Sequence, residues 1–398
     1  MEETILALLD GGEEGRRALL QLQLLGMPAV KRLISMARTA DPGASMVLSS
    51  ALPHLHVPGM LEEMVPLLSD TNADLSLAAY DWLAQTKESG ATKVLLDVLS
   101  DEARSLNERW LAAEALGSRG EFAVLPELRR VASRVTDIGR DAGLLREQLD
   151  SAGLDDSALR FLIKLAVAEA RLGGEELSAL PVAIACLKVS TDRDSIVRVE
   201  AVSALASVAA AGCFEALVSA LGADDIEVAT SAMEPLRLLG ERRVVDVLVD
   251  LVAQKHPELG ELSLSTLVAI TGPGIGEHRS VFDLAPDEIR NWWQGQISKY
   301  SPGVCYRRGV PFELATLVAL LKDPAERDTV AREFFFITGI SCGFDPEAPP
   351  ELQDEVATNA ERALAGLGAR FLAGKYYKYG NERNLAEAMR TGVLGPGV

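Results

Sequence analysis

One short unit, a pair of helices joined by an acidic turn, recurs along this chain and limits what it can fold into. In its clearest copy, 194–205, the apolar residues Val197, Ala201 and Leu205 fall every four positions, the spacing of one buried helix face. A partner helix is expected at 213–221, and a second copy follows directly. Such pairs bury their apolar faces only against neighbouring pairs, so the pattern predicts an all-α stack.

The period of the repeat divides the chain. A leucine ends the first helix of each pair, just before the acidic turn, at Leu68, Leu99, Leu187, Leu221 and Leu251. The intervals are 31, 88, 34 and 30 residues, and the long one is close to three periods. We therefore expect N-terminal helix pairs over 1–134, an irregular bridging pair with an insertion over 135–180, regular repeats over 181–272, and atypical repeats with a cap over 273–398, continuous with the stack.

Composition supports helices and restricts the partners. Aromatic residues make up only 5% of the chain, and Ala, Leu and Val dominate its apolar content, which favours closely packed helices over sheets. There are 39 Lys and Arg against 58 Asp and Glu, a net charge of −19, which repels phosphate backbones and anionic lipid. We expect no nucleic-acid or membrane partner. No signal-like start or long apolar run is visible, which predicts a cytoplasmic protein.

The residues that usually build catalytic or metal sites do not converge. The four cysteines, Cys186, Cys213, Cys305 and Cys342, contain no Cys-x-x-Cys pair, so buried thiols are expected. His54 and His56 lie in a loop between two prolines, and no third ligand lies near them in sequence. The sequence therefore predicts no catalytic residue, metal or other cofactor.

Two stretches carry a family resemblance. The segments 112–117 (Ala-Ala-Glu-Ala-Leu-Gly) and 235–240 (Pro-Leu-Arg-Leu-Leu-Gly) end inner helices in Leu-Gly after a Leu-x-Asp type of turn. Over residues 26–272 the chain resembles the short HEAT-like repeats of the phycobilisome-lyase type. The resemblance implies a right-handed α-α superhelix, a HEAT-like solenoid whose surface binds partner proteins. Pro235 departs from the repeat and is expected to kink its helix.

The C-terminal third repeats a second motif. Ile270-Thr271-Gly272 and Ile337-Thr338-Gly339 lie 67 residues apart, and a Phe-Asp loop follows each of them. This region is similar to the ending of uncharacterised bacterial HEAT-repeat proteins, some of which are linked with type VI secretion. We expect Gly272 and Gly339 to adopt a left-handed helix cap, and Asp283 and Asp345 to cap the helices that follow.

Aromatic and basic residues near the C-terminus have two interpretations. Trp, Tyr and Arg dominate binding hot spots, and the residues of this kind are Trp292, Trp293, Tyr300, Tyr306, Arg307 and Arg308. Tyr376 and Tyr377 alternate with lysines in a second such stretch. The first interpretation is a surface that binds a partner; the second is core packing for the Trp and Tyr group and a strand-like tail for the lysine-rich stretch.

Two function classes follow. The first is a non-enzymatic scaffold or adaptor that binds partner proteins in the bacterial cytoplasm. The second is a HEAT-fold enzyme or small-ligand binder, related to bilin lyases or, less in keeping with the acidic charge, to DNA glycosylases. A deep pocket that holds His54 or a cluster of carboxylates would favour the second class.

Overall fold

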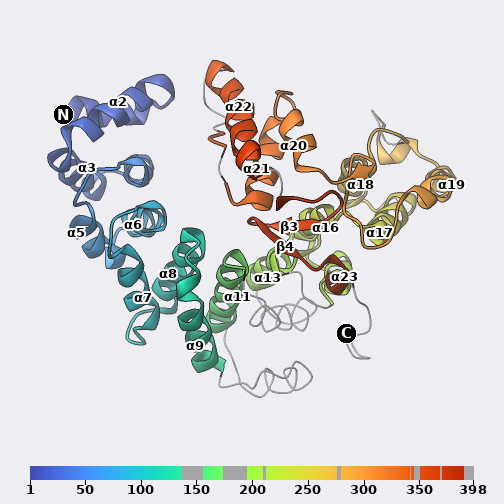
Figure 1. Cartoon of the computed structure of the whole chain (residues 1–398), viewed down its shortest axis with the longest axis horizontal. Helices are drawn as coiled ribbons and strands as arrows, with labels where there is room; N and C mark the ends of the chain where they lie inside the picture. The colour runs from blue at the N-terminus through green and yellow to red at the C-terminus, as the bar shows by residue number, and fades with distance from the viewer. Residues whose placement is uncertain are drawn as a thin grey trace. The chain divides into compact units, whose positions relative to one another are not determined.

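Helices account for nearly all regular structure in the described part of the chain, which Figure 1 shows as a ribbon. The computed structural model describes residues 1–136, 156–173, 195–208, 212–275, 279–340, 342–344, 350–367 and 370–389. Strands occur there only as two short hairpins. The predicted all-α solenoid class is confirmed, because successive helices pack on one another in chain order.

The chain separates into two compact units. Unit 1 comprises Met1–Val135 with Phe344–Glu355, and unit 2 comprises Thr136–Gly343 with Val356–Val398. The four segments proposed from the regularity of the repeat, with boundaries at 134, 180 and 272, remain a prediction, and much of 135–180 lies outside the described residues. Within the described ranges, no helix has both the length and the apolar composition of a membrane span.

Unit 1 is a run of antiparallel helices with short 3-10 turns between them. Its longer helices are α2 (Gly12–Leu25), α3 (Met27–Thr39), α4 (Pro42–Ser50), α6 (Ala73–Gln85), α7 (Ala91–Ser100), α8 (Leu106–Arg119) and α9 (Leu125–Thr136). The shorter elements are α1 (Glu2–Leu6), η1 (Ala7–Asp10), η2 (Leu52–His54), α5 (Leu61–Met64), η3 (Val65–Ser69) and η4 (Phe122–Val124). Helices α4, α6 and α8 contact one another in turn and form one row of the stack.

Local sequence explains where these helices begin and which face they bury. The side chain of Asn72 accepts the N–H groups of Asp74 and Leu75 and so starts α6. Ser105 and Glu108 form a reciprocal capping box at the start of α8. The apolar face predicted for α6 is confirmed, since Leu75, Ala78, Ala79, Trp82 and Leu83 are all buried.

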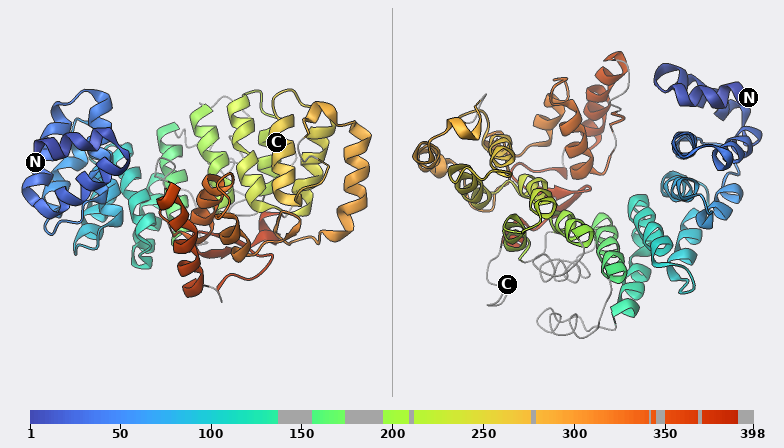
Figure 2. Two further views of the ribbon diagram at one scale, coloured as in Figure 1. Left: turned by 90° about the horizontal axis from the view of Figure 1, so that it is seen from above. Right: turned by 180° about the vertical axis from the view of Figure 1, so that it is seen from behind.

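Unit 2 contains a second row of helices, which stand side by side in Figure 2. They are α11 (Asp156–Arg171), α13 (Ser195–Val208), α14 (Cys213–Leu221), α15 (Ile226–Ser231), α16 (Met233–Leu239), α17 (Arg242–Ala253), α18 (Gly260–Thr271) and α19 (Pro286–Gln296). The remainder is η5 (Val281–Asp283), η6 (Ile297–Lys299), α20 (Leu314–Leu320), α21 (Arg327–Thr338), α22 (Pro350–Leu367) and α23 (Leu385–Ala388). Helix α22 crosses the boundary between the units near 355.

Proline breaks the repeat where the sequence suggested a kink. The expected helix is divided into α15 and α16, and Pro235 lies in the first turn of α16. The first-turn N–H groups of a helix have no partner within that helix, so a proline there costs no hydrogen bond. The predicted helices α14 and α11 are confirmed, whereas the helix expected to end at Leu187 lies outside the described residues.

Two hairpins of the same design pack on the two Ile-Thr-Gly motifs. Strands β1 (Tyr306–Arg307) and β2 (Val310–Pro311) pair antiparallel, as do β3 (Tyr376–Lys378) and β4 (Asn381–Arg383). Each has a two-residue turn in which both residues have positive φ, the type I′ geometry that matches strand twist. The turn N–H groups of the first hairpin donate to the carbonyls of Ala269 and Ile270, and those of the second to Phe336 and Ile337. Each hairpin thus caps the end of one helix, α18 or α21.

The predictions for the residues around these motifs have mixed outcomes. Gly339 ends α21 in the left-handed conformation, with φ 73° and ψ 8°, as expected. Gly272 was wrongly predicted to do the same, because its ψ of 177° makes it extended at positive φ. Asp283 does not cap α19; its carboxylate accepts the N–H of Ser280 instead. Asp345 lies outside the described residues.

Candidate functional site

The aromatic residues singled out from the sequence do come together in unit 2, as one row of rings. Trp292 and Trp293 lie on α19 with ring centroids 6.2 Å apart, Trp293 lies 5.1 Å from Tyr300, and Tyr300 lies 4.7 Å from Tyr306. The indole N–H of Trp293 donates to the carboxylate of Asp246 at 2.6 Å. The row therefore joins α19, the η6 turn and the first hairpin to α17, and it acts as packing.

Burial favours the second interpretation, packing within the unit, for most of these residues. Six of the eight are buried, namely Trp293, Tyr300, Tyr306, Arg307, Tyr376 and Tyr377. A buried side chain cannot contact a partner unless the unit opens, and the sequence did not reveal that the two hairpins enclose these residues. Trp292, which is half-buried, and Arg308, which is exposed, remain predicted contact residues.

Arg307 belongs instead to a buried ionic cluster. Its Nε donates to the Glu333 carboxylate at 2.6 Å, and Nη2 donates to the carbonyl of Leu238, the penultimate residue of α16, at 2.8 Å. Arg237 donates to the other oxygen of Glu333 at 2.5 Å. Burial alone would raise the pKa of the Glu333 carboxyl, but Arg307 and Arg237 outweigh burial and lower that pKa to about 2. Burial raises the pKa of the adjacent Cys305 thiol, which disfavours a reactive thiolate.

Lys378 takes the corresponding place in the second hairpin, directly before its turn. It is also buried, and its Nζ lies 4.3 Å from the ring centroid of Phe336 and 5.3 Å from that of Tyr379. Burial lowers the pKa of this amine to about 7. Four charged groups around it act in opposite directions: Glu234 and Glu333 raise the pKa, and Arg171 and Arg237 lower it. The same hairpin reaches α11, where the Asn381 amide donates to the carbonyl of Arg171 at 3.1 Å.

Sequence reasoning missed Glu333, although a signal was present. Val330, Phe334 and Ile337 mark the buried face of α21, and Glu333 stands three residues after Val330 and four before Ile337. A carboxylate inside an apolar face requires a cationic partner, so it could have been marked as one half of a buried pair. The identity of the partners could not be found, because Arg237 lies 96 residues away.

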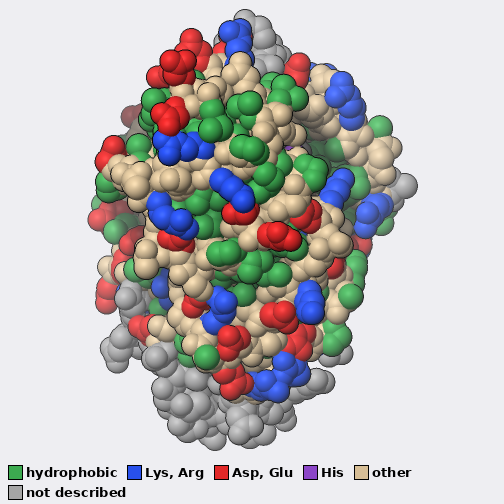
Figure 3. Space-filling view, turned by 90° about the vertical axis from the view of Figure 1, so that its left-hand side faces the viewer, with side chains coloured by type: hydrophobic (Ala, Val, Ile, Leu, Met, Phe, Trp, Pro, Cys, Tyr) green, Lys and Arg blue, Asp and Glu red, His purple; other side chains and the backbone are tan. Residues whose placement is uncertain are grey.

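Exposed leucines stand out at the start of unit 1. Leu20 and Leu24 lie one turn apart on α2, and their side chains are 64% and 88% exposed. Gln21 shares this face, and an Arg17–Glu13 ion pair continues it toward the helix start. Elsewhere charge is mixed: on the face shown in Figure 3, acidic and basic side chains lie scattered among hydrophobic ones, and neither sign dominates.

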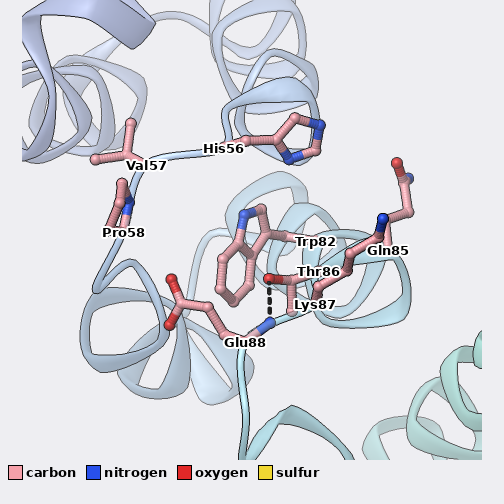
Figure 4. A pocket seen from close by; sticks show the side chains of 8 residues that line it. All are labelled: His56, Val57, Pro58, Trp82, Gln85, Thr86, Lys87 and Glu88. Carbon is pink, nitrogen blue, oxygen red and sulfur yellow. Dashed lines mark hydrogen bonds between the residues drawn. The ribbon is translucent and has the colours of Figure 1, made fainter.

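A pocket of about 710 Å³ opens beside the loop that follows α6 (Figure 4). It is lined by His56, Val57, Pro58, Trp82, Gln85, Thr86, Lys87 and Glu88. All eight belong to unit 1, and they come from two loops and the end of one helix. The sequence analysis named a pocket with His54 or a cluster of carboxylates as support for an enzyme or small-ligand binder. This pocket contains His56 instead of His54, and it contains one carboxylate rather than a cluster.

A shallower hollow of about 590 Å³ adjoins the pocket and shares Lys87 and Glu88 with it. Lys93 and Arg119 also line it. Arg119 is engaged, because it donates to the carbonyls of Leu83 and Thr86 and to Thr92. Across the described residues, no group of three or more His, Cys, Asp or Glu side chains is placed to hold a metal ion.

Comparison with known proteins adds only weak likenesses. No family model matches the sequence, and no curated protein matches it. Among solved structures, human deoxyhypusine hydroxylase in complex with glycerol is 20% identical, with a TM-score of 0.25, and the match covers 52% of this chain and 95% of that one. Two engineered proteins match at 17% identity, covering 88% of this chain and 84% of theirs (TM-score 0.33), and at 21%, covering 58% and 96% (TM-score 0.28). Scores this low carry no information on activity.

Proposed function

We propose that this chain is a non-enzymatic adaptor of the short HEAT-like type, which binds a protein partner in the bacterial cytoplasm through the outer face of α2. The observation that carries the proposal is the pair of exposed leucines, Leu20 and Leu24. Solenoids normally cover their end with a polar face, because an apolar end promotes association. Here the second helix of the chain presents two leucines one turn apart, with Gln21 between them.

Burial of these leucines would supply part of the energy of binding. Full burial of one leucine side chain is worth about 1.5–3 kcal/mol. The partner that fits is a protein with an apolar helix or groove, since the leucines form a narrow stripe rather than a charged patch. The Arg17–Glu13 pair at the edge of the stripe suits a polar rim. The acidic charge of the chain argues against nucleic acid as the partner.

The test compares two double variants with the wild type. Leu20→Glu with Leu24→Glu places two charges on the proposed face, while Leu77→Glu with Phe122→Glu places the same charges at other exposed apolar positions of unit 1. The partner is captured from the native cytoplasm with the wild-type protein, purified, and titrated against all three by calorimetry. We expect the α2 variant to bind at least about thirtyfold more weakly and the control to match the wild type.

Two results would refute the proposal. Equal binding by both variants would place the contact elsewhere. Self-association of the wild type that only the α2 variant abolishes in sedimentation would show that a second copy of the chain covers the leucines.

A further inference from the structure

The pocket beside the 86–90 loop is held open by its own hydrogen bonds. The Glu88 carboxylate accepts the backbone N–H groups of Gly59 and Met60 at 2.9 and 3.2 Å and so ties the loop to the start of α5. The indole N–H of Trp82 donates to the carbonyl of Leu55 at 3.1 Å, and the Thr86 hydroxyl accepts the N–H of Glu88. Ligand pockets are usually preformed in this way, and this one is within the usual size range.

Some polar side chains of the pocket already make hydrogen bonds within the protein, and others do not. The Glu88 carboxylate keeps its charge but already accepts N–H groups, and the Trp82 N–H is satisfied. The side chains of His56, Gln85 and Lys87, labelled in Figure 4, are exposed, and within the described part of the chain they make no hydrogen bond or ion pair. The charge left without a partner is therefore the Lys87 ammonium.

The floor of the pocket is apolar. It is formed by Pro58, which is exposed, and by Trp82 and Val57, which are only 2% and 6% exposed. A planar apolar group can pack on such a floor. A cation in the same place would meet the Lys87 ammonium, and the oxygens of Glu88 already accept the N–H groups of Gly59, Met60 and Leu61.

We propose that this pocket is a binding site for a small organic anion, whose planar apolar group packs on Pro58 beside Trp82 and Val57 while its carboxylate or sulfonate pairs with Lys87. His56 and Gln85 supply further hydrogen bonds to the anionic group. This site is separate from the leucines of α2, and the inference does not depend on the proposed adaptor function.

The experiment uses the full chain and two probes of nearly the same shape. The anionic probe is 1-naphthaleneacetate, and the cationic probe is 1-naphthaleneethylamine, both titrated by calorimetry at 150 mM salt to screen the overall charge. We expect saturable binding of one naphthaleneacetate per chain and at least about tenfold weaker binding of the amine. Lys87→Glu is expected to weaken naphthaleneacetate binding about tenfold or more.

Lys93 offers a matched control. It is also an exposed lysine without a described ion pair, and it lines the adjoining hollow but not the pocket. Lys93→Glu makes the same change in net charge, and we expect it to leave binding within about twofold of the wild type. Lys87→Met, checked for helicity beside Lys87→Glu, separates loss of the cation from introduction of an anion.

Three results would overturn the inference. The first is no saturable binding of naphthaleneacetate to the folded wild type. The second is binding of the amine as tight as that of the acetate. The third is an equal loss in the Lys87 and Lys93 variants, which would mean that net charge, not this pocket, governs the binding.

Discussion

The two C-terminal hairpins share a backbone design but treat their buried cation differently. In each, a type I′ turn caps a helix that ends in Ile-Thr-Gly, and a basic residue immediately precedes the turn. In the first hairpin this residue, Arg307, meets the carboxylate of Glu333 at 2.6 Å. In the second, Lys378 meets the faces of Phe336 and Tyr379.

The difference shows how the choice of cation matches its surroundings. Arg cannot lose its proton in a protein, so a buried Arg needs a carboxylate; Lys can be buried because its pKa can fall. Glu333 raises the pKa of Arg307, although burial opposes it, whereas burial lowers the pKa of Lys378 to about 7. The first hairpin is therefore held by charge, and the second by packing that favours a neutral amine.

Removing the carboxylate charge of Glu333 at the first hairpin is expected to have the largest effect on stability. Glu333→Gln leaves the buried guanidinium group of Arg307 without a carboxylate, while Arg237 keeps only Glu234, so the free energy of unfolding should fall by about 3–5 kcal/mol. Urea unfolding followed by circular dichroism measures this loss. Adding Arg307→Met should recover part of it, because the uncompensated charge is then removed. A loss below about 1 kcal/mol would mean that water or other groups already compensate both arginines.

The next largest effect on stability is expected when the glycines of the two motifs are replaced by alanine, and it should differ between the two hairpins. A Cβ on Gly272 would lie 2.6 Å from the carbonyl oxygen of Arg308, and its φ of 83° with ψ of 177° is open only to glycine. On Gly339 the nearest atoms, those of Tyr379, would be 3.5 Å away. We expect Gly272→Ala to cost about 3 kcal/mol and Gly339→Ala about 1 kcal/mol. Thermal unfolding of both variants tests the order, and equal losses would contradict it.

The pH dependence of stability should come from the second hairpin. The pKa of Lys378 is about 7 in the folded chain against 10.5 when it is free, so the unfolded chain binds more protons between these values. Its contribution to stability should therefore rise with pH above about 7. Lys378→Met should remove this rise and be about 1–2 kcal/mol more stable than the wild type at pH 7.

The free energy of unfolding of the wild type and of Lys378→Met is measured in urea at pH 7 and pH 9. The difference between the two proteins at each pH cancels the contributions of the other titrating groups. If the difference between them does not shrink as pH rises, the amine is charged in the folded state and the two rings stabilise it.

The smallest effect is expected at the exposed ion pair of the first hairpin. Arg308 and Glu326 lie 2.6 Å apart, but each is more than a third exposed. Glu326→Gln should change the free energy of unfolding by less than about 0.5 kcal/mol, and the change should vanish at 1 M salt. This variant also serves as the surface control for Glu333→Gln. A larger, salt-resistant loss would mean that the turn is held from outside as well as by its backbone.

Periodic burial made the helices predictable from sequence. The positions of α11 and α14 and the inner face of α6 follow from apolar residues three or four apart and from capping side chains, which act within one helix. The aromatic group around Trp293 was recognised, but the sequence left open whether it is buried. The pocket was missed because its residues are ordinary ones from two loops and one helix end, and only their approach in space makes a site.

The sequence by itself determined the all-α class, the helix pairs and the break near Pro235, because short-range spacing encodes all three. Only the tertiary structure decided that Arg307 is buried, that Gly272 is extended rather than left-handed, and that Lys87 has no partner among the described residues. Each of these depends on residues distant in sequence, such as Glu333 for Arg307 and Arg308 for Gly272. Local pattern carries no information on which distant chain segment will supply the contact.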